Sequence, residues 1–207
     1  MIKIQTENIG KKFKNEWIFR NLNLEIQNGS PLAVVGPNGS GKSTFMQALA
    51  GIIPVNEGKV KFFEDSLPIE EGNWHEYLSF SAPYMELIEE FTLIEAIEFH
   101  IKFKKLKNGI TQNQFLELIQ LDTQKEKTIK NFSSGMRQKL KLGLAFYSES
   151  LILLLDEPTA NLDQIGFEWY FDQVTSLSSE KLIIISSNEP KEYSFCKNQL
   201  NILNFKN

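Results

Sequence analysis

A glycine-rich segment from Gly36 to Thr44, with the sequence GPNGSGKST, has the residue types needed to bind phosphate groups. It fits the pattern G-x-x-x-x-G-K-[ST], in which glycines let successive backbone N–H groups turn toward an anion. A glycine-rich turn that precedes a lysine by chance is the alternative. We predict a nucleotide-phosphate site formed by Gly36, Pro37, Asn38, Gly39, Ser40, Gly41, Lys42, Ser43 and Thr44, with Lys42 contacting the outer phosphates and Ser43 binding Mg²⁺.

Two adjacent carboxylates, Asp156 and Glu157, end the apolar run LILLLDEP at residues 151–158. In open α/β folds, ligands bind at the carboxyl edge of the sheet, where these side chains would project. Neighbouring strand residues point to opposite faces, which suggests two roles. Asp156 would hold Mg²⁺ through water, and Glu157 would orient or deprotonate the attacking water. Strand-end acids are also common as solvated turn residues or helix caps, so the phosphate loop is what favours catalysis here.

The elements around these motifs alternate between strands and helices. The run PLAVVG at 31–36 predicts a buried strand before the phosphate loop, and Phe45, Leu49 and Ile52 predict a helix after it, with these side chains on one buried side. A further buried strand is predicted at 182–187, with a helix between it and the acidic strand. This β, α, β order implies a parallel sheet with right-handed crossovers.

The flanking segments have different periods. Residues 1–30 alternate between apolar and polar and predict antiparallel strands, and 58–64 predicts another strand. Residues 84–147 have apolar residues at helical spacing throughout, which predicts an all-helical insertion packed beside the sheet. We therefore expect one α/β domain over 1–207, with a mixed sheet core and amino-terminal antiparallel β subdomain at 1–83 and 148–207, and a helical subdomain at 84–147.

The composition excludes several classes of protein. The chain has 207 residues, 42% of them apolar, which is enough for a buried core. Its formal net charge of −4 argues against a nucleic-acid partner. Cys196 is the only cysteine, which excludes an internal disulfide framework and favours a reducing compartment. No apolar run approaches the ~18 residues of a membrane-spanning helix, so we expect any membrane role to come through a partner.

The order of the motifs resembles the ATP-binding cassette of ABC proteins over nearly the whole chain, which implies a P-loop NTPase fold of the RecA-like type. Between the phosphate loop and the acidic strand lies NFSSGMRQ at 131–138. It resembles the cassette signature, with Ser133, Ser134 and Gly135 at the matching positions. In the family this segment binds the γ-phosphate of the nucleotide held by the other subunit. An ordinary serine cap is the alternative, and the two are compatible because a capped helix start also binds anions.

The resemblance implies roles for two more residues. The segment from Ala160 to Asp163 is similar to the dimer-contact loop that follows the acidic strand, although Asp163 could equally be a plain helix cap. Phe13 lies where cassettes usually place an aromatic ring against the adenine, with Trp17 as the substitute. A core or surface phenylalanine is the alternative for Phe13.

Two positions depart from the family pattern, and the first concerns a glutamine that usually touches Mg²⁺. This chain has no glutamine between Gln47 and Gln112, and Pro83 lies closest to the expected place. A proline side chain neither binds a metal nor donates a hydrogen bond. Coupling to a membrane partner must therefore use backbone groups, water or the nearby Glu86.

The second departure is Asn188, which follows the last core strand where the family normally has histidine. His75 and His100 are the only histidines in the chain. Asparagine can donate a hydrogen bond but cannot carry a proton or a charge. Because phosphoryl transfer depends mainly on positioning and electrostatics, we expect slow but real hydrolysis, with Glu157, Asn188 and Lys42 as the catalytic residues. A plain turn residue is the alternative for Asn188.

The resemblance implies the ATP-binding and ATP-hydrolysing subunit of an ABC membrane transporter, peripheral to the cytoplasmic face of the cell membrane, with ATP and Mg²⁺ as cofactors. It implies a second cassette subunit, in a homodimer or heterodimer, and no nucleic acid. The short length and the SSGMRQ form favour export slightly. Integral membrane permease subunits are expected to dock at 83–97, through Tyr84, Met85, Leu87, Ile88 and Phe91, although these side chains could instead fill the core of the helical part.

Two other classes of function are weighed against a transporter motor. A soluble cassette ATPase of DNA repair would carry a long coiled coil between Lys42 and Ser133, for which the chain has too few residues, and translation types usually carry two cassettes. A nucleotide-dependent switch with little turnover is suggested by Pro83 and Asn188. The retained Glu157 argues against it.

Overall fold

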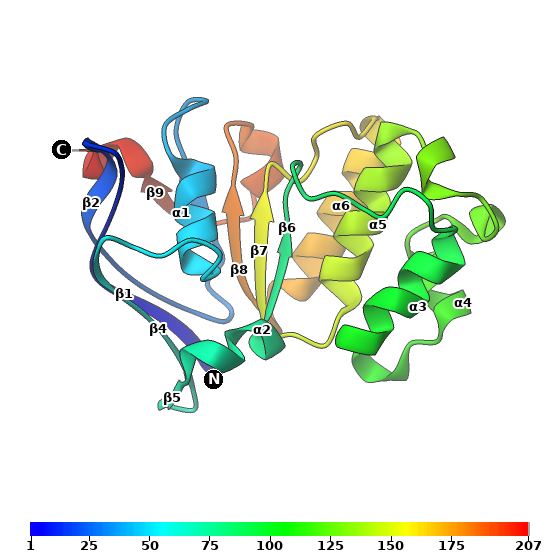
Figure 1. Cartoon of the computed structure of the whole chain (residues 1–207), viewed down its shortest axis with the longest axis horizontal. Helices are drawn as coiled ribbons and strands as arrows, with labels where there is room; N and C mark the ends of the chain where they lie inside the picture. Colours follow the sequence, from blue (N-terminus) through cyan, green and yellow to red (C-terminus); the bar gives the residue numbers. More distant parts are fainter. Residues whose placement is uncertain (207) are drawn as a thin grey trace.

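The computed structural model describes residues 1–206 and contains two β-sheets with helices between and beside them (Figure 1). The first sheet is antiparallel, with strand order β2-β1-β4-β5. Its inward-facing side chains alternate along the start of β1, as the period of two predicted. The strands are β1 (Ile2–Phe13), β2 (Glu16–Gln27), β4 (Glu57–Glu64) and β5 (Leu67–Ile69).

The second sheet is entirely parallel and has the order β6-β7-β8-β3-β9. Every residue of its two central strands β7 and β8 is buried, which is why their sequences are continuous apolar runs. The core sheet predicted as mixed is thus entirely parallel, and the predicted antiparallel β subdomain forms a sheet of its own. The strands are β3 (Leu32–Val35), β6 (Leu78–Ser81), β7 (Ile152–Asp156), β8 (Leu182–Ser186) and β9 (Asn198–Asn201).

Four of the α-helices in the described residues begin at side-chain caps. Thr92 and Thr111 each accept a hydrogen bond from a backbone N–H of the next turn and form capping boxes at the starts of α3 and α4. The helices are α1 (Lys42–Leu49), α2 (Trp74–Tyr77), α3 (Leu93–Phe103), α4 (Gln112–Leu118), α5 (Ser134–Tyr147) and α6 (Gln164–Leu177). Short 3₁₀ turns lie at Glu71–Asn73, Lys107–Gly109, Asp122–Gln124, Ile129–Asn131, Pro190–Tyr193 and Ile202–Phe205.

Two details of the helical prediction are wrong. Residues 84–92 form an extended loop rather than helix, so the helical part begins at Leu93. Ile52 does not extend the buried side of α1, because that helix ends at Leu49 and Gly51 takes a left-handed conformation with φ 72°. Ile52 is consequently exposed, whereas Phe45 and Leu49 are buried as expected.

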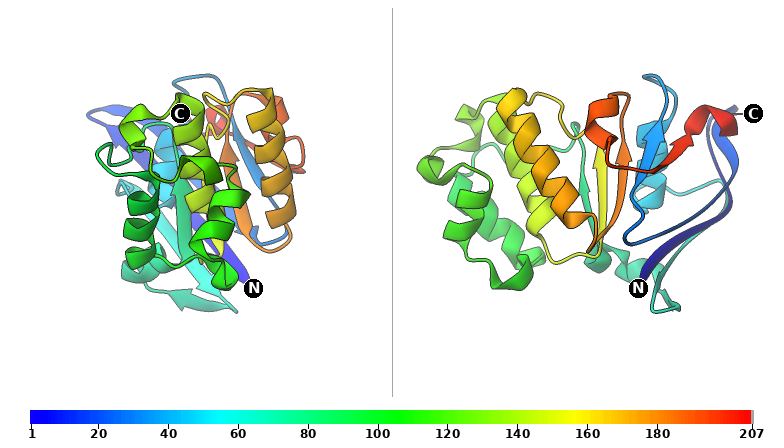
Figure 2. Two further views of the ribbon diagram at one scale, coloured as in Figure 1. Left: turned by 90° about the vertical axis from the view of Figure 1, so that its right-hand side faces the viewer. Right: turned by 180° about the vertical axis from the view of Figure 1, so that it is seen from behind.

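The parallel sheet separates two hydrophobic cores, and alternate residues of β7 face different ones. Ile152 and Leu154 belong to the core shared with α1 and the antiparallel sheet. Leu153 and Leu155 belong to the core shared with α3, α4, α5 and α6. Figure 2 shows α5 and α6 on the side of the sheet away from the antiparallel strands. Because the parallel sheet contributes to both cores and so joins the helical part to the antiparallel sheet, we propose that residues 1–207 form the single domain predicted.

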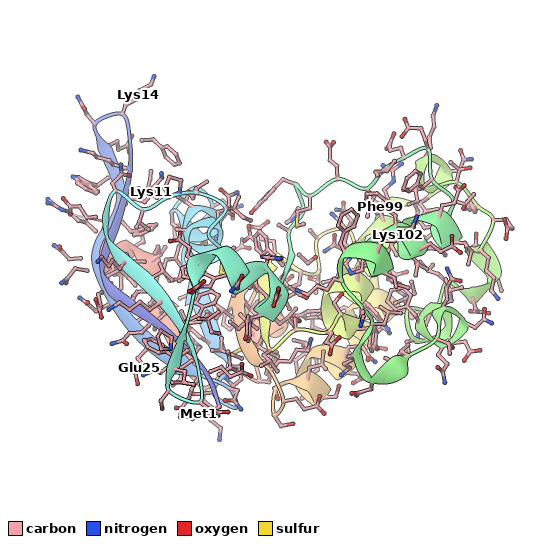
Figure 3. The ribbon with its side chains drawn as sticks, turned by 60° about the horizontal axis from the view of Figure 1, so that its bottom comes forward. Met1, Lys11, Lys14, Glu25, Phe99 and Lys102 are labelled. Atoms are coloured by element: carbon pink, nitrogen blue, oxygen red, sulfur yellow. The ribbon has the colours of Figure 1, made fainter. Side chains whose placement is uncertain are left out.

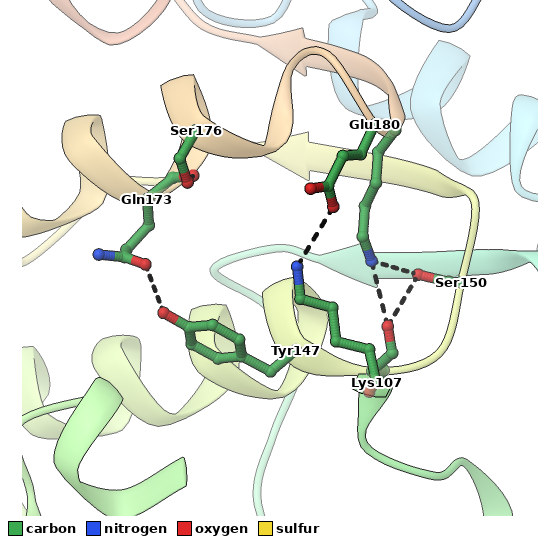
Figure 4. Close-up of polar contacts among 8 residues, drawn as sticks. Lys107, Tyr147, Ser150, Gln173, Ser176 and Glu180 are labelled. Atoms are coloured by element: carbon green, nitrogen blue, oxygen red, sulfur yellow. Dashed lines mark hydrogen bonds and ion pairs between the residues drawn. The ribbon is translucent and has the colours of Figure 1, made fainter. Parts of the chain in front are cut away.

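Polar contacts fix the end of the parallel sheet opposite to the carboxyl ends of its strands (Figure 4). Lys181, just before β8, donates to the Ser148 carbonyl at 3.1 Å and to the Ser150 hydroxyl at 3.0 Å. Burial lowers the pKa of this lysine to about 7. The Tyr147 hydroxyl donates to Gln173, which joins α5 to α6.

Among the helices of residues 1–206, none has the length and apolar character to span a bilayer.

The pairing register brings four strand ends to one edge of the parallel sheet. Ser186 pairs with Asp156 on one side and with Val34 on the other. Ser81 pairs with Leu155, one residue short of the end of β7. The loops that leave β3, β7, β8 and β6 therefore emerge side by side, as the β, α, β order predicted.

Close packing between α4 and α5 gives a test of this fold. A Cβ atom on Gly143 of α5 would lie 2.2 Å from Cγ2 of Ile119, which is fully buried. We expect Gly143→Ala to lower the free energy of unfolding by about 1–3 kcal/mol through overpacking. Denaturant unfolding followed by circular dichroism measures it.

The control is Gly72→Ala, where an added Cβ meets no heavy atom within 4 Å. This variant should stay within about 0.5 kcal/mol of the parent. Equal stability of the two variants would contradict the packing of α4 on α5.

Candidate nucleotide-binding site

The predicted phosphate loop follows β3 and leads into α1, as its motif requires. Its conformation depends on glycine at two positions. A Cβ on Gly36 (φ 152°) would lie 2.7 Å from Oγ of Ser40, and one on Gly41 (φ 107°) would lie 2.5 Å from Cγ2 of Ile18. Since real Cβ atoms do not approach neighbours so closely, Gly36 is needed for the loop to close on itself and Gly41 for the loop to pack against β2.

Lys42 lies at the start of α1 and reaches back across the loop. Its Nζ donates to the carbonyl oxygens of Gly36 at 2.9 Å and Pro37 at 3.3 Å, and the residue is 4% exposed. The hydroxyl of Ser40 is buried without a partner among residues 1–206. A polyphosphate would offer both groups charged oxygen acceptors, which form stronger hydrogen bonds than carbonyls. The loop therefore fits an anion of this kind.

The two acids differ in their surroundings. Asp156 ends β7, is 1% exposed, and accepts a hydrogen bond from the Ser186 hydroxyl. Glu157 lies beyond the strand at φ 42°, a conformation that non-glycine residues seldom adopt, and its N–H donates to the Ser186 carbonyl at 2.8 Å. The strand alternation used to assign different roles therefore ends at Asp156, and this left-handed turn sets the direction of Glu157.

The residues predicted to bind Mg²⁺ are oxygen donors from neighbouring elements. Ser43 is in the first turn of α1, and α1 packs against β7, whose last residue is Asp156. Mg²⁺ in nucleotide sites is usually held by one or two protein oxygens together with phosphates and water, and this pair fits that preference. Within residues 1–206, no group of three or more His, Cys, Asp or Glu side chains is arranged to hold a metal by itself.

The loop after β8 carries Asn188 beside the phosphate loop. The N–H of Ser187 donates to the Val34 carbonyl at 3.2 Å, which ties this loop to the strand that leads into the phosphate loop. Asn188 itself is exposed. The next buried group is Glu192, which bonds Thr159 after the acidic strand. Sequence reasoning missed Glu192, because two acids, Glu189 and Glu192, follow this strand and nothing in the sequence shows which of them is buried.

The loop around Pro83 is held through its backbone. Lys141 of α5 donates from Nζ to the carbonyl oxygens of Ala82 at 3.3 Å and Pro83 at 3.1 Å. Partial burial lowers the pKa of Lys141. These bonds give a backbone link of the kind expected where the glutamine is missing, and they join this loop to the helix that begins at Ser134. Glu86 is exposed.

The signature residues lie at the start of α5, on the opposite face of the parallel sheet from α1. The Ser133 side chain caps the helix by accepting from the Met136 N–H at 3.2 Å, and Ser133 and Ser134 are both exposed. A Cβ on Gly135 would lie 3.2 Å from the Asn161 carbonyl, so the helix start packs against the loop after the acidic strand. The structure does not bring these serines into the group at the sheet edge.

Asp163 caps α6, since its side chain accepts from the Gly166 N–H at 2.8 Å. The plain helix-cap interpretation is therefore satisfied. The residue is also exposed, which leaves its predicted dimer contact open to test.

Of the two adenine candidates, Phe13 has the freer ring. Phe13 is 51% exposed, and Lys11 lies over it at 5.1 Å while donating to the Pro54 carbonyl at 2.7 Å. The Trp17 ring is contacted by two cations, Lys12 at 5.1 Å and Arg20 at 4.5 Å. Figure 3 shows Lys11 on this β1–β2 hairpin, remote from Phe99 on α3. Phe13 stays our prediction for the stacking residue.

An apolar groove of about 740 Å³ lies between the end of α1, the loop after β6, α3 and α5. Met85 and Ile88 line the groove and are each 41% exposed, and Tyr84, which does not line it, is 48% exposed, so these predicted anchors do not fill the core. Leu87 and Phe91 are partly buried against the helical core. Phe91, Phe99 and Phe103 form a row along the groove. The ring centroids of Phe91 and Phe99 are 5.5 Å apart, and those of Phe99 and Phe103 are 5.1 Å apart.

A parallel sheet whose carboxyl edge carries a phosphate loop with its lysine, a buried aspartate and an adjacent glutamate defines a phosphate-loop nucleotide hydrolase. Comparisons with known proteins specify the family. The family model for ABC transporters matches residues 19–160.

Two curated relatives and one solved structure illustrate the likeness. The lantibiotic transport ATP-binding protein SrtF of Streptococcus pyogenes is 30% identical over 193 residues, which cover 91% of this chain and 80% of that protein. The sulfate/thiosulfate import ATP-binding protein CysA of Mesostigma viride is 33% identical over 78% of this chain and 47% of its own length. The dimeric ATP-binding cassette MJ0796, in a post-hydrolysis state with ADP and Pi, has a TM-score of 0.81 at 20% identity, covering 96% of this chain and 94% of that one.

The family match spans more than half of the residues, and SrtF matches nearly all of them. This chain therefore belongs to the ABC transporter family as an ATP-binding cassette, and it is an ATPase of that type. The fold class predicted from the sequence is confirmed.

The assignment of Phe13 to the adenine gives a prediction that separates the contribution of the base to ATP affinity from that of the phosphates. Phe13→Ala should weaken ATP binding by about 1–2 kcal/mol, roughly 5- to 30-fold in Kd, because a stacked aromatic face is lost. Binding of inorganic tripolyphosphate should not change, since the phosphate loop is untouched. Calorimetric titration with both ligands measures the effect.

Trp17→Ala is the matched control, and it should lose less affinity for ATP than Phe13→Ala. If instead Trp17→Ala loses the affinity and Phe13→Ala keeps it, the roles of the two rings are exchanged.

Proposed function

We propose that this chain is the motor subunit of an ABC membrane transporter, in which two cassettes close around two ATP molecules at the cytoplasmic face of the membrane. The observation that carries the proposal is the separation of two phosphate-binding groups. The phosphate loop, Asp156 and Glu157 share the carboxyl edge of the parallel sheet. Ser133 and Ser134 are exposed at the start of α5, on the face of that sheet opposite to α1. A second subunit would bring the two groups together.

The residues at the sheet edge would divide the work of hydrolysis. Backbone N–H groups of the phosphate loop and the helix start of α1 would hold the phosphates, with Lys42 moving from the Gly36 and Pro37 carbonyls to the outer phosphate oxygens. Glu157 would orient the attacking water or take its proton. Asn188, exposed beside the phosphate loop, would donate a hydrogen bond to a γ-phosphate oxygen.

Ser43 and Asp156 are the residues that would hold Mg²⁺. The ion would neutralise developing charge on the phosphates. Asp156 would act from a fixed position, because the Ser186 hydroxyl already bonds one of its oxygens. Pro83 contributes no side-chain ligand, so the loop after β6 would respond to the site through the Ala82 and Pro83 carbonyls bonded by Lys141.

Closure of the dimer would be driven by contacts that exist only when ATP lies between the subunits. Ser133 and Ser134 already present a capped helix start, which favours an anion at that position. Asp163 and the loop before it would contact the twin subunit. Hydrolysis would remove the shared γ-phosphate and release the pair.

The apolar groove is the surface that we assign to the permease subunits. It has room for a short helix or loop, and the exposed Met85, Ile88 and Phe99 are anchors of the type found at interface centres. Lys141 lines the same groove and bonds the Pro83 loop, so a docked partner would sense both α5 and the nucleotide edge. For direction we propose export, on the SSGMRQ form of the signature.

Turnover gives the first test of this function. Glu157→Gln should hydrolyse MgATP at least ~10²-fold more slowly than the parent, because the amide neither accepts the proton of water nor stabilises it by charge. Release of phosphate by purified protein measures it. Glu149→Gln, a change at an exposed residue after α5, is the control and should hydrolyse at the parent rate. Unchanged turnover in Glu157→Gln would refute the catalytic assignment.

Membrane association gives the second test. Met85→Arg with Ile88→Arg should reduce the fraction of protein that co-sediments with native membranes by about tenfold or more, because buried charges at an interface centre cost several kcal/mol. Ile165→Arg, at an exposed apolar residue of α6 outside the groove, is the control and should remain with the membranes. Equal sedimentation of both variants, with folding confirmed by circular dichroism, would exclude the groove as the docking surface.

A further inference from the structure

One buried carboxyl in the chain has no role in the motifs described above. Glu192 lies in the 3₁₀ turn Pro190–Tyr193, four residues after Asn188, and is 3% exposed. A buried acid without a nearby base is unfavourable unless its oxygens are bonded, so its partners indicate what it does.

One oxygen of Glu192 holds the loop that follows the catalytic acid. Oε1 accepts from the backbone N–H of Thr159 at 3.0 Å and also from the Thr159 hydroxyl. Thr159 is two residues beyond Glu157. The Glu192 carbonyl oxygen accepts from the hydroxyl of Tyr170 at 3.0 Å, and Tyr170 of α6 is fully buried. The backbone of Glu192 is therefore tied to α6, and its carboxyl reaches across to the loop after Glu157.

The other oxygen, Oε2, is buried without a hydrogen-bond partner in the described residues. Burial raises the pKa of Glu192, the Ser187 and Thr159 hydroxyls oppose the shift, and the negative charge of Glu157 adds to it. Tyr170 of α6 and Cys196 are further titratable groups at this position.

The conformation of Glu157 makes this contact significant for hydrolysis. At φ 42° Glu157 is held in a strained turn, which persists only where its surroundings fix the following residues. Thr159 is the nearest following residue with a side-chain bond from another loop, and that loop also carries Asn188.

We propose that Glu192 is a positioning residue for ATP hydrolysis. It clamps the loop after Glu157 against the turn after Asn188, so that the carboxylate and the amide address the same γ-phosphate. The inference rests on the proposed function of the sheet edge, and it concerns the geometry of that site rather than nucleotide binding.

The kinetic test uses two variants. Glu192→Ala should lower kcat by roughly 10- to 100-fold, because a small misplacement of a catalytic group has effects of this size. KM for ATP should stay within about twofold, since the phosphate loop is not touched. Glu192→Gln should restore most of kcat, because its amide oxygen accepts both Thr159 bonds and its nitrogen can donate to the Ser187 hydroxyl.

A fall of kcat at unchanged KM in Glu192→Ala, recovered in Glu192→Gln, is a readout that a purely structural contact would not produce. The pH dependence of stability gives a second readout. The folded pKa of Glu192 is raised, so its favourable contribution is present below the unfolded value near 4.5 and is lost as pH rises through the folded pKa. The stability of Glu192→Gln relative to the parent should therefore increase with pH over that range.

Thr159→Val keeps the backbone donor and removes the hydroxyl. Its loss of kcat should not add to that of Glu192→Ala, because both break the same clamp. Full kcat in Glu192→Ala, or additive losses of kcat when Glu192→Ala and Thr159→Val are combined, would overturn the proposal. If Glu192→Ala fails to fold, the kcat and KM of Thr159→Val decide. Failure of the hydrolytic function itself would show separately, as unchanged turnover in Glu157→Gln.

Discussion

Parallel pairing of β3, β8 and β7 is the constraint on which the rest of the structure depends. Ser186 pairs with both Val34 and Asp156, so the phosphate loop, the acids and the Asn188 loop must leave the sheet at one edge. A parallel sheet must be packed on both faces. Alternate apolar residues of its strands pack on one face against α1 and on the other against the helical part. The positions of the phosphate loop and the acids thus depend on the two hydrophobic cores that hold the parallel sheet in place.

Motifs that specify local backbone geometry could be predicted from the sequence. The phosphate loop needs glycine at Gly36 and Gly41 for reasons of close approach, and the pattern names those positions directly. Continuous apolar runs likewise predicted the central parallel strands. Near Pro83, where coupling through backbone groups, water or Glu86 was expected, Lys141 bonds two backbone carbonyls, and the sequence did not indicate this lysine.

Contacts between distant segments could not be predicted, because no local period encodes them. Glu192 and Thr159 are brought together only by the tertiary fold, and Ile52 is exposed because a left-handed glycine ends α1 one turn earlier than its apolar spacing suggested. The direction of Glu157 was argued from strand alternation, yet a turn sets it. A single chain does not contain the dimer interface. The exposure of Ser133 and Ser134 is the feature of this chain that points to one.

The central claim is that the signature serines of one subunit seal the phosphate loop of its twin. Disulfide formation tests it most directly, between a Ser134→Cys chain and an Asn38→Cys chain, both with Cys196→Ser and Glu157→Gln. The account predicts a cross-link between the two different chains when MgATP is present and little or none without nucleotide. The same yield with and without ATP, or cross-links only between identical chains, would contradict it.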